Sequence, residues 1–102
     1  MTNERTRKTL LILNAYDSTA QKMKCCEELA ELETAILKHI NKGSNTDAIL
    51  EELADVYIML EQLKYMMPFG VNQLEDMIDF KLDRQIRRIK GLDDEHADCA
   101  WR

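Results

Sequence analysis

Glycine and proline are scarce in this chain and stand in only three places. Three glycines and one proline occur in 102 residues: Gly43, the closely spaced Pro68 and Gly70, and Gly91. Such residues end or break helices, so the stretches between them are long and uninterrupted. No stretch alternates polar and apolar residues as a half-buried strand does. The chain is therefore predicted to be all-α, an antiparallel helical bundle of about four helices.

Apolar residues recur every three or four positions within each stretch, which predicts the helices themselves. Their expected ranges are 3–16, 17–42, 47–67 and 72–90. In the second range the predicted core-facing residues are Cys25, Leu29, Leu32, Ile36 and Ile40. Residues 1–91 are expected to form one helical domain, since a chain of this length supports a single modest core. Residues 92–102 form an acidic C-terminal tail.

Charge and hydropathy limit the expected partners and location. The net charge of -5 argues against general nucleic-acid binding, which favours basic proteins. No apolar run approaches the roughly 20 residues that span a bilayer, and residues 10–13 are too short for a signal-peptide core. Cys25, Cys26 and Cys99 lack the CxxC spacing of zinc sites and are interpreted as reduced structural thiols. A cytoplasmic protein with no membrane partner is expected.

An acidic pentapeptide occurs almost twice. The sequence Glu-Glu-Leu-Ala-Glu at 27–31 returns as Glu-Glu-Leu-Ala-Asp at 51–55. Residues three apart on a helix point the same way, so each copy presents a pair of carboxylates on one face. These pairs are Glu28 with Glu31 and Glu52 with Asp55, and both lie beside the predicted apolar stripe. If the two helices pack through their stripes, four carboxylates meet at the mouth of the bundle.

Four carboxylates, three of which have no local cation, predict a divalent metal site. The alternative is a solvated acidic face whose charges pair with Lys or Arg one turn away. Glu28 has Lys24 four residues before it, but Glu31, Glu52 and Asp55 have no basic residue three or four positions away. Oxygen ligands select Mg²⁺, or Mn²⁺, over zinc. Glu27 and Glu51 open the two copies, and each is either a catalytic group that orients water or an exposed glutamate.

Basic residues on the second and fourth predicted helices suggest what the metal carries. Lys38 lies two helical turns after Glu31, and Lys81, Arg84 and Arg88 follow one another at spacings of three and four. Each is individually best explained as part of a solvated face. Together with an acidic cluster, they favour binding of a nucleotide polyphosphate.

These motifs resemble the MazG-like all-α nucleoside triphosphate pyrophosphohydrolases. The resemblance rests on EExxE at 27–31, ExxD at 52–55, Lys38 and the pattern Lys81-x-x-Arg84, and it covers roughly residues 17–90. It implies Mg²⁺ bound by Glu28, Glu31, Glu52 and Asp55. It also implies cleavage of a nucleoside triphosphate between its α- and β-phosphates, with phosphates bound by Lys38, Lys81 and Arg84. Members are commonly dimers or dimer pairs, so a homodimer or homotetramer is expected to complete the bundle. Many relatives carry Asn shortly before the Lys, where this chain has Asp79.

Two other classes of protein compete with the enzyme. One is a non-catalytic helical module that dimerises or binds a protein partner, and the other is a regulatory protein that binds metal or nucleotide without turnover. The concentration of unpaired carboxylates at Glu31, Glu52 and Asp55 favours the enzyme over a pure interaction module. The sequence leaves the base and sugar preference open.

Overall fold

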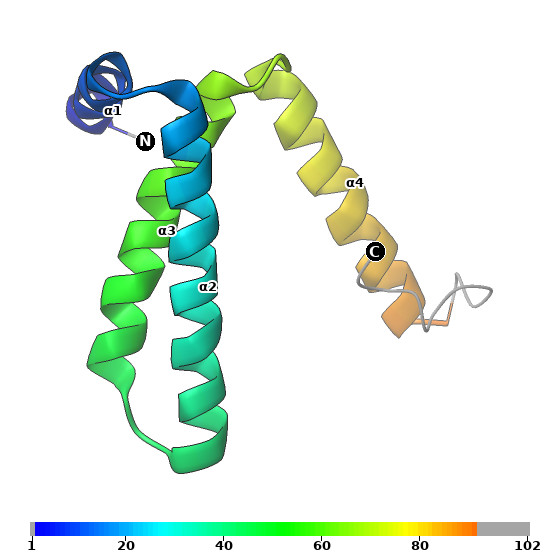
Figure 1. The fold of residues 1–102 in the computed structure, drawn as a ribbon. Helices are drawn as coiled ribbons and strands as arrows, with labels where there is room; N and C mark the ends of the chain where they lie inside the picture. Colours follow the sequence, from blue (N-terminus) through cyan, green and yellow to red (C-terminus); the bar gives the residue numbers. More distant parts are fainter. Residues whose placement is uncertain (1, 92–102) are drawn as a thin grey trace. The chain divides into compact units, whose positions relative to one another are not determined.

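The computed structural model describes residues 2–91 and contains four helices and no strand within that range (Figure 1). They are α1 (Asn3–Ala15), α2 (Ser18–Lys42), α3 (Thr46–Met66) and α4 (Val71–Ile89). The all-α prediction is confirmed, and each predicted end lies within two residues of the observed one. The chain divides into two compact units, Met1–Pro68 and Phe69–Arg102. None of the described helices combines the length and apolarity needed to cross a bilayer.

Local chemistry fixes the ends of α2. The Asp17 carboxylate accepts a hydrogen bond from the backbone N–H of Ala20 at 3.1 Å, which caps the first turn. Gly43 ends the helix with φ of +95°, a left-handed conformation that favours glycine. The Asn45 side chain donates to the Ala35 carbonyl at 3.0 Å and so ties the following loop back onto α2. The helix end predicted at Gly43 is confirmed.

The first unit is built on an antiparallel hairpin of α2 and α3, and α1 also contacts α3 (Figure 1). Its buried apolar core is small and consists of Cys25, Ala35, Val56 and Met59. A hydrogen bond of 2.7 Å joins two buried side chains across the hairpin, from Gln21 Nε2 to Gln62 Oε1. Because α2 and α3 are antiparallel, the residue ten positions after Gln21 lies opposite the residue ten positions before Gln62. These two residues are Glu31 and Glu52. The glutamine pair thus fixes the register that sets Glu31 opposite Glu52.

Breaking the glutamine pair should destabilise the hairpin. We expect Gln62→Leu to lower the free energy of unfolding by about 1–3 kcal/mol, because the buried Gln21 amide loses its partner. Adding Gln21→Leu should restore much of that loss, since two apolar groups then face each other. Urea denaturation of the two variants checks this. A double variant no more stable than Gln62→Leu alone would contradict it.

The side of α2 that meets α3 differs from the predicted stripe. The buried residues of α2 are Gln21, Cys25, Glu28 and Ala35. Leu29, Ile36 and Ile40, which were predicted to face the core, are exposed. The helix is therefore rotated about its axis so that its polar edge, including Glu28, enters the contact. The prediction that the carboxylates flank the contact is wrong for Glu28, because small Ala35 and the hydrogen-bonded Gln21 allow close approach on that edge.

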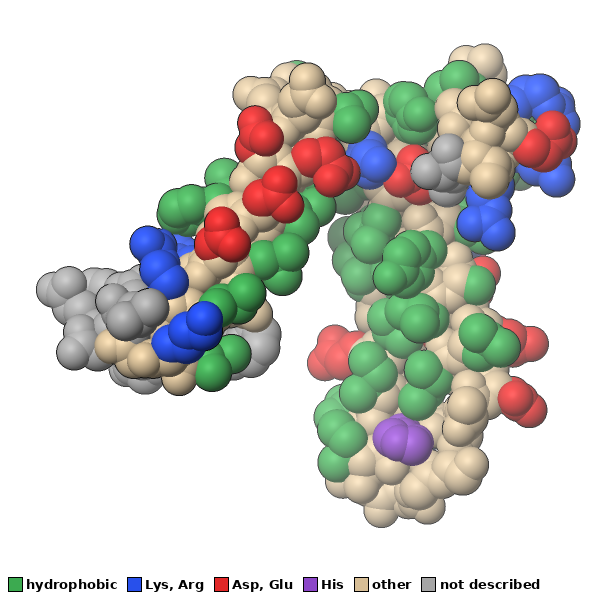
Figure 2. Space-filling view, turned by 180° about the vertical axis from the view of Figure 1, so that it is seen from behind, with side chains coloured by type: hydrophobic (Ala, Val, Ile, Leu, Met, Phe, Trp, Pro, Cys, Tyr) green, Lys and Arg blue, Asp and Glu red, His purple; other side chains and the backbone are tan. Residues whose placement is uncertain are grey.

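The displaced apolar residues form an exposed surface on one side of the hairpin. Figure 2 shows hydrophobic side chains running along this side. We call it the hairpin apolar face, and its members are Leu29, Ile36, Ile40, Leu53, Tyr57 and Leu60, each 40–69% exposed. Since a helix turns about 100° per residue, Glu31 and Lys38 lie on the opposite side of α2 from Leu29.

The second unit consists of α4 among the described residues. The Gln73 side chain accepts a hydrogen bond of 2.7 Å from the backbone N–H of Gly70, which closes the first turn. The apolar residues Leu74, Ile78, Leu82 and Ile89 lie on one side of α4, and no residue of this helix is buried.

Candidate metal centre

Three glutamates of the repeated motif come together between α2 and α3. Glu28 and Glu31 project from α2 and Glu52 from α3, and each offers a carboxylate oxygen within 4.8 Å of the other two. Octahedral Mg²⁺ holds oxygens at about 2.1 Å, so its ligand oxygens lie about 3–4 Å apart. Small side-chain rotations would therefore bring these three oxygens to that spacing.

Glu28 is the most informative member of the group. It is only 6% exposed, which is unusual for a glutamate. Its Oε1 lies 3.1 Å from Lys24 Nζ, whereas its Oε2 is buried and has no hydrogen-bond partner. The Oε2 atom of Glu52 is likewise buried without a partner. A buried carboxylate oxygen without a partner is energetically costly, and a cation would satisfy both of these oxygens.

Charge repulsion perturbs Glu31. The pKa of Glu31 is raised above its ordinary value, first because the Glu28 carboxylate repels its ionised form. The negative charge of the neighbouring Glu52 carboxylate also favours the protonated form of Glu31. Without metal, Glu31 therefore releases its proton at a higher pH than an isolated glutamate does. A divalent cation and this proton offset the same repulsion, so they compete for the site.

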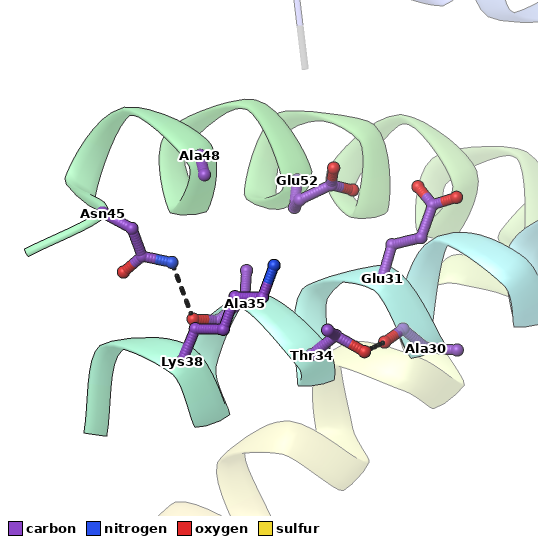
Figure 3. Close-up of a pocket in the computed structure, with 8 residues that line it drawn as sticks. All are labelled: Ala30, Glu31, Thr34, Ala35, Lys38, Asn45, Ala48 and Glu52. Atoms are coloured by element: carbon purple, nitrogen blue, oxygen red, sulfur yellow. Dashed lines mark hydrogen bonds between the residues drawn. The ribbon is translucent and has the colours of Figure 1, made fainter. Parts of the chain in front are cut away.

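A pocket of about 340 Å³ adjoins the cluster (Figure 3). Glu31, Glu52 and Lys38 line it together with Ala30, Thr34, Ala35, Asn45 and Ala48. The structure thus brings the predicted phosphate-binding Lys38 into the same pocket as two of the predicted metal ligands. Asn45 was not predicted as a site residue. Its Oδ1 is buried without a partner.

The other acidic residues of the motif lie outside this group. Asp55 is exposed on α3, one turn after Glu52, and its side chain is one methylene shorter than that of a glutamate. Glu51 is exposed on α3, and Glu27 is exposed on α2 with its Oε2 3.4 Å from Lys24 Nζ. Hydrogen bonds with Glu28 and then Glu27 raise the pKa of Lys24.

The remaining predicted phosphate ligands belong to the second unit. Lys81 and Arg84 lie on α4, where the Arg84 guanidinium carbon is 5.5 Å from the centroid of the Phe80 ring. This distance is that of a cation–π contact. Of the cysteines, Cys25 is buried and its thiol pKa is raised by that burial, and Cys26 is exposed. Cys99 and the predicted tail lie outside the described residues.

Comparison of the chain with protein-family models, with curated proteins and with solved structures finds no match. The chemistry of the cluster and its pocket is therefore the basis for inferring function.

Proposed function

We propose that this protein is a Mg²⁺-dependent nucleoside triphosphate pyrophosphohydrolase. The observation that carries the proposal is the group of Glu28, Glu31 and Glu52, in which the buried Glu28 has an oxygen without a partner. Mg²⁺, or Mn²⁺, would be held by these three carboxylates, with Asp55 as the predicted fourth ligand. Such a partly open oxygen site suits Mg²⁺, which commonly binds a few carboxylates together with substrate phosphates.

The proposed reaction adds water to a nucleoside triphosphate and gives a nucleoside monophosphate and pyrophosphate. The water oxygen forms a bond to the α-phosphorus, and the bond from that phosphorus to the oxygen bridging toward the β-phosphorus breaks. Glu27 or Glu51 accepts the proton of the water. The bound metal supplies charge stabilisation for the phosphate oxygens and the leaving pyrophosphate.

Cationic side chains are proposed to bind the phosphates. Lys38 lies in the pocket beside Glu31 and Glu52, which supports a role next to the metal. Lys81 and Arg84 are proposed from the sequence pattern alone. Ammonium and guanidinium groups would offset the negative charge that develops on the pyrophosphate.

A substrate panel tests the proposed activity. Purified protein is incubated with each ribonucleoside and deoxyribonucleoside triphosphate and Mg²⁺, and both products are measured. Equimolar monophosphate and pyrophosphate from at least one nucleotide, lost when EDTA replaces Mg²⁺, is the expected result. Release of orthophosphate in place of pyrophosphate, or no turnover at high enzyme concentration, would contradict the proposal.

We also propose that the chain self-associates through the hairpin apolar face. This face exposes six large hydrophobic side chains on one side of the hairpin, and contiguous exposed apolar patches mark protein–protein interaction sites. A homodimer or homotetramer would cover it. Self-association alone is also what the competing interaction-module hypothesis requires, so it does not distinguish the two functions.

Adding a charge to this face should dissociate the protein. We expect light scattering after gel filtration to give at least twice the 11.9 kDa chain mass for the unaltered protein. Tyr57→Lys should give the single-chain mass, because a lysine would be buried without a partner. Asn41→Lys, which adds the same charge to α2 outside this face, should not change the mass. A single-chain mass for the unaltered protein would overturn the proposal.

A further inference from the structure

Lys24 contacts two glutamates of the first acidic motif at once. Its Nζ lies 3.1 Å from Glu28 Oε1 and 3.4 Å from Glu27 Oε2. The two contacts differ in their surroundings, because the Glu28 side chain is 8% exposed and the Glu27 side chain 64% exposed. Lys24 itself is half exposed and keeps its access to water. It therefore brings a cation to a buried carboxylate without being buried itself.

The position of this contact relates it to the metal centre. Lys24 engages one oxygen of Glu28, and the other, Oε2, has no partner. Glu28 thereby remains able to offer an oxygen to the group formed with Glu31 and Glu52. A cation so close to the cluster stabilises three neighbouring carboxylates, but it also repels any second cation that enters.

We infer that Lys24 is the built-in counter-ion of the metal centre: it stabilises the cluster before the metal binds and weakens metal binding. This inference rests on the proposed function, since it assumes that the cluster binds a divalent cation. Lys24 acts through Glu28 and is a positioning residue, not a metal ligand. The alternative is an ordinary helical ion pair, which contributes little to stability and nothing to metal affinity.

The inference predicts opposite effects on two measurements. In EDTA, Lys24→Met should lower the melting temperature by several degrees, since the buried Glu28 carboxylate loses its ion pair with Lys24. In titration calorimetry with Mg²⁺ or Mn²⁺ alone, the same change should lower Kd by roughly three- to tenfold, because one repulsive charge is gone. A purely structural role would weaken stability and metal binding together.

Two substitutions complete the design. Lys24→Arg keeps the charge and should leave both quantities near those of the unaltered protein. Lys22→Met removes the same charge from an exposed position two residues away and should change neither. Lys24→Gln, which keeps an N–H donor for Glu28, replaces the Met variant if that variant does not fold.

The outcomes separate this inference from the proposed function. If the unaltered protein binds Mg²⁺ and the neutral Lys24 variants bind it equally or more weakly, the role of Lys24 is overturned and the metal site stands. If the unaltered protein binds neither cation, both the metal site and the role of Lys24 are overturned. Tighter binding in the neutral variants with reduced stability in EDTA supports the inference.

Discussion

Glu52→Gln should abolish Mg²⁺-dependent pyrophosphohydrolysis, with a loss of at least about 100-fold in kcat/KM. The substitution keeps the size of the side chain and removes one negative charge. Glu52 is the only member of the grouped carboxylates that comes from α3, and its buried Oε2 has no partner. Losing it would remove the only grouped carboxylate from α3 and leave Asp55 as the one proposed ligand on that helix. Initial rates with the preferred nucleotide measure the effect.

The matched control for Glu52→Gln is Glu33→Gln. Glu33 is exposed on α2 and lies outside both the cluster and the pocket, so its loss removes the same charge without touching the site. We expect Glu33→Gln to keep full activity. Full activity in Glu52→Gln would show that the reaction does not depend on this cluster.

Glu28→Met should make the metal-free protein more stable while it removes metal binding. Glu28 is buried, and its carboxylate has only one of its two oxygens paired. A methionine of similar length would replace this charge by apolar contact at the interface of α2 and α3. We expect the free energy of unfolding in EDTA to rise by about 1–3 kcal/mol. Lys24 is half exposed and would remain solvated.

Urea denaturation with EDTA and with Mg²⁺ checks both halves of this prediction. The unaltered protein should gain stability on adding Mg²⁺, and Glu28→Met should not. Glu33→Met on the exposed side of α2 provides the control for an added methionine. If Glu28→Met proves less stable than the unaltered protein in EDTA, Glu28 has a structural role that is fulfilled without metal.

The positions of the helices followed from local signals in the sequence. Asp17 caps α2 and Gly43 ends it, and Pro68 follows α3 closely. These effects depend on backbone geometry within a few residues, so they can be predicted without knowing the tertiary contacts. The acidic repeat likewise identified the residues that the structure groups, because i, i+3 spacing determines which side chains share a helix face.

The rotation of α2 could not be predicted in the same way. Its apolar residues cover a broad arc, and periodicity does not tell which edge of that arc meets α3. The buried pair of Gln21 and Gln62 decides the register, yet neither glutamine stands out in the sequence. This rotation buries Glu28 and leaves Leu29 and Ile36 exposed. The relation of Asp55 to the other carboxylates also depends on this rotation.

The pKa of Glu31 predicts how metal binding depends on pH. Folding raises this pKa, so the folded protein holds the proton more tightly than the unfolded chain. Protonation of Glu31 therefore contributes to the free energy of unfolding. This contribution is fully present below the unfolded-state pKa of Glu31 and is lost as pH rises through its folded-state pKa. Glu28 and Glu52 are the charged groups that raise this pKa. Metal binding should therefore strengthen as pH rises through this range and Glu31 loses its proton.

Titration calorimetry tests the cation site most directly. Mg²⁺ or Mn²⁺ is titrated into the metal-free protein at about pH 8, without nucleotide. We predict saturable binding that is lost in Glu28→Met and Glu52→Gln and kept in Glu33→Gln. Binding should weaken at about pH 5, because the proton then competes for Glu31. Heats from the unaltered protein no larger than those of Glu28→Met would contradict a metal centre at Glu28, Glu31 and Glu52.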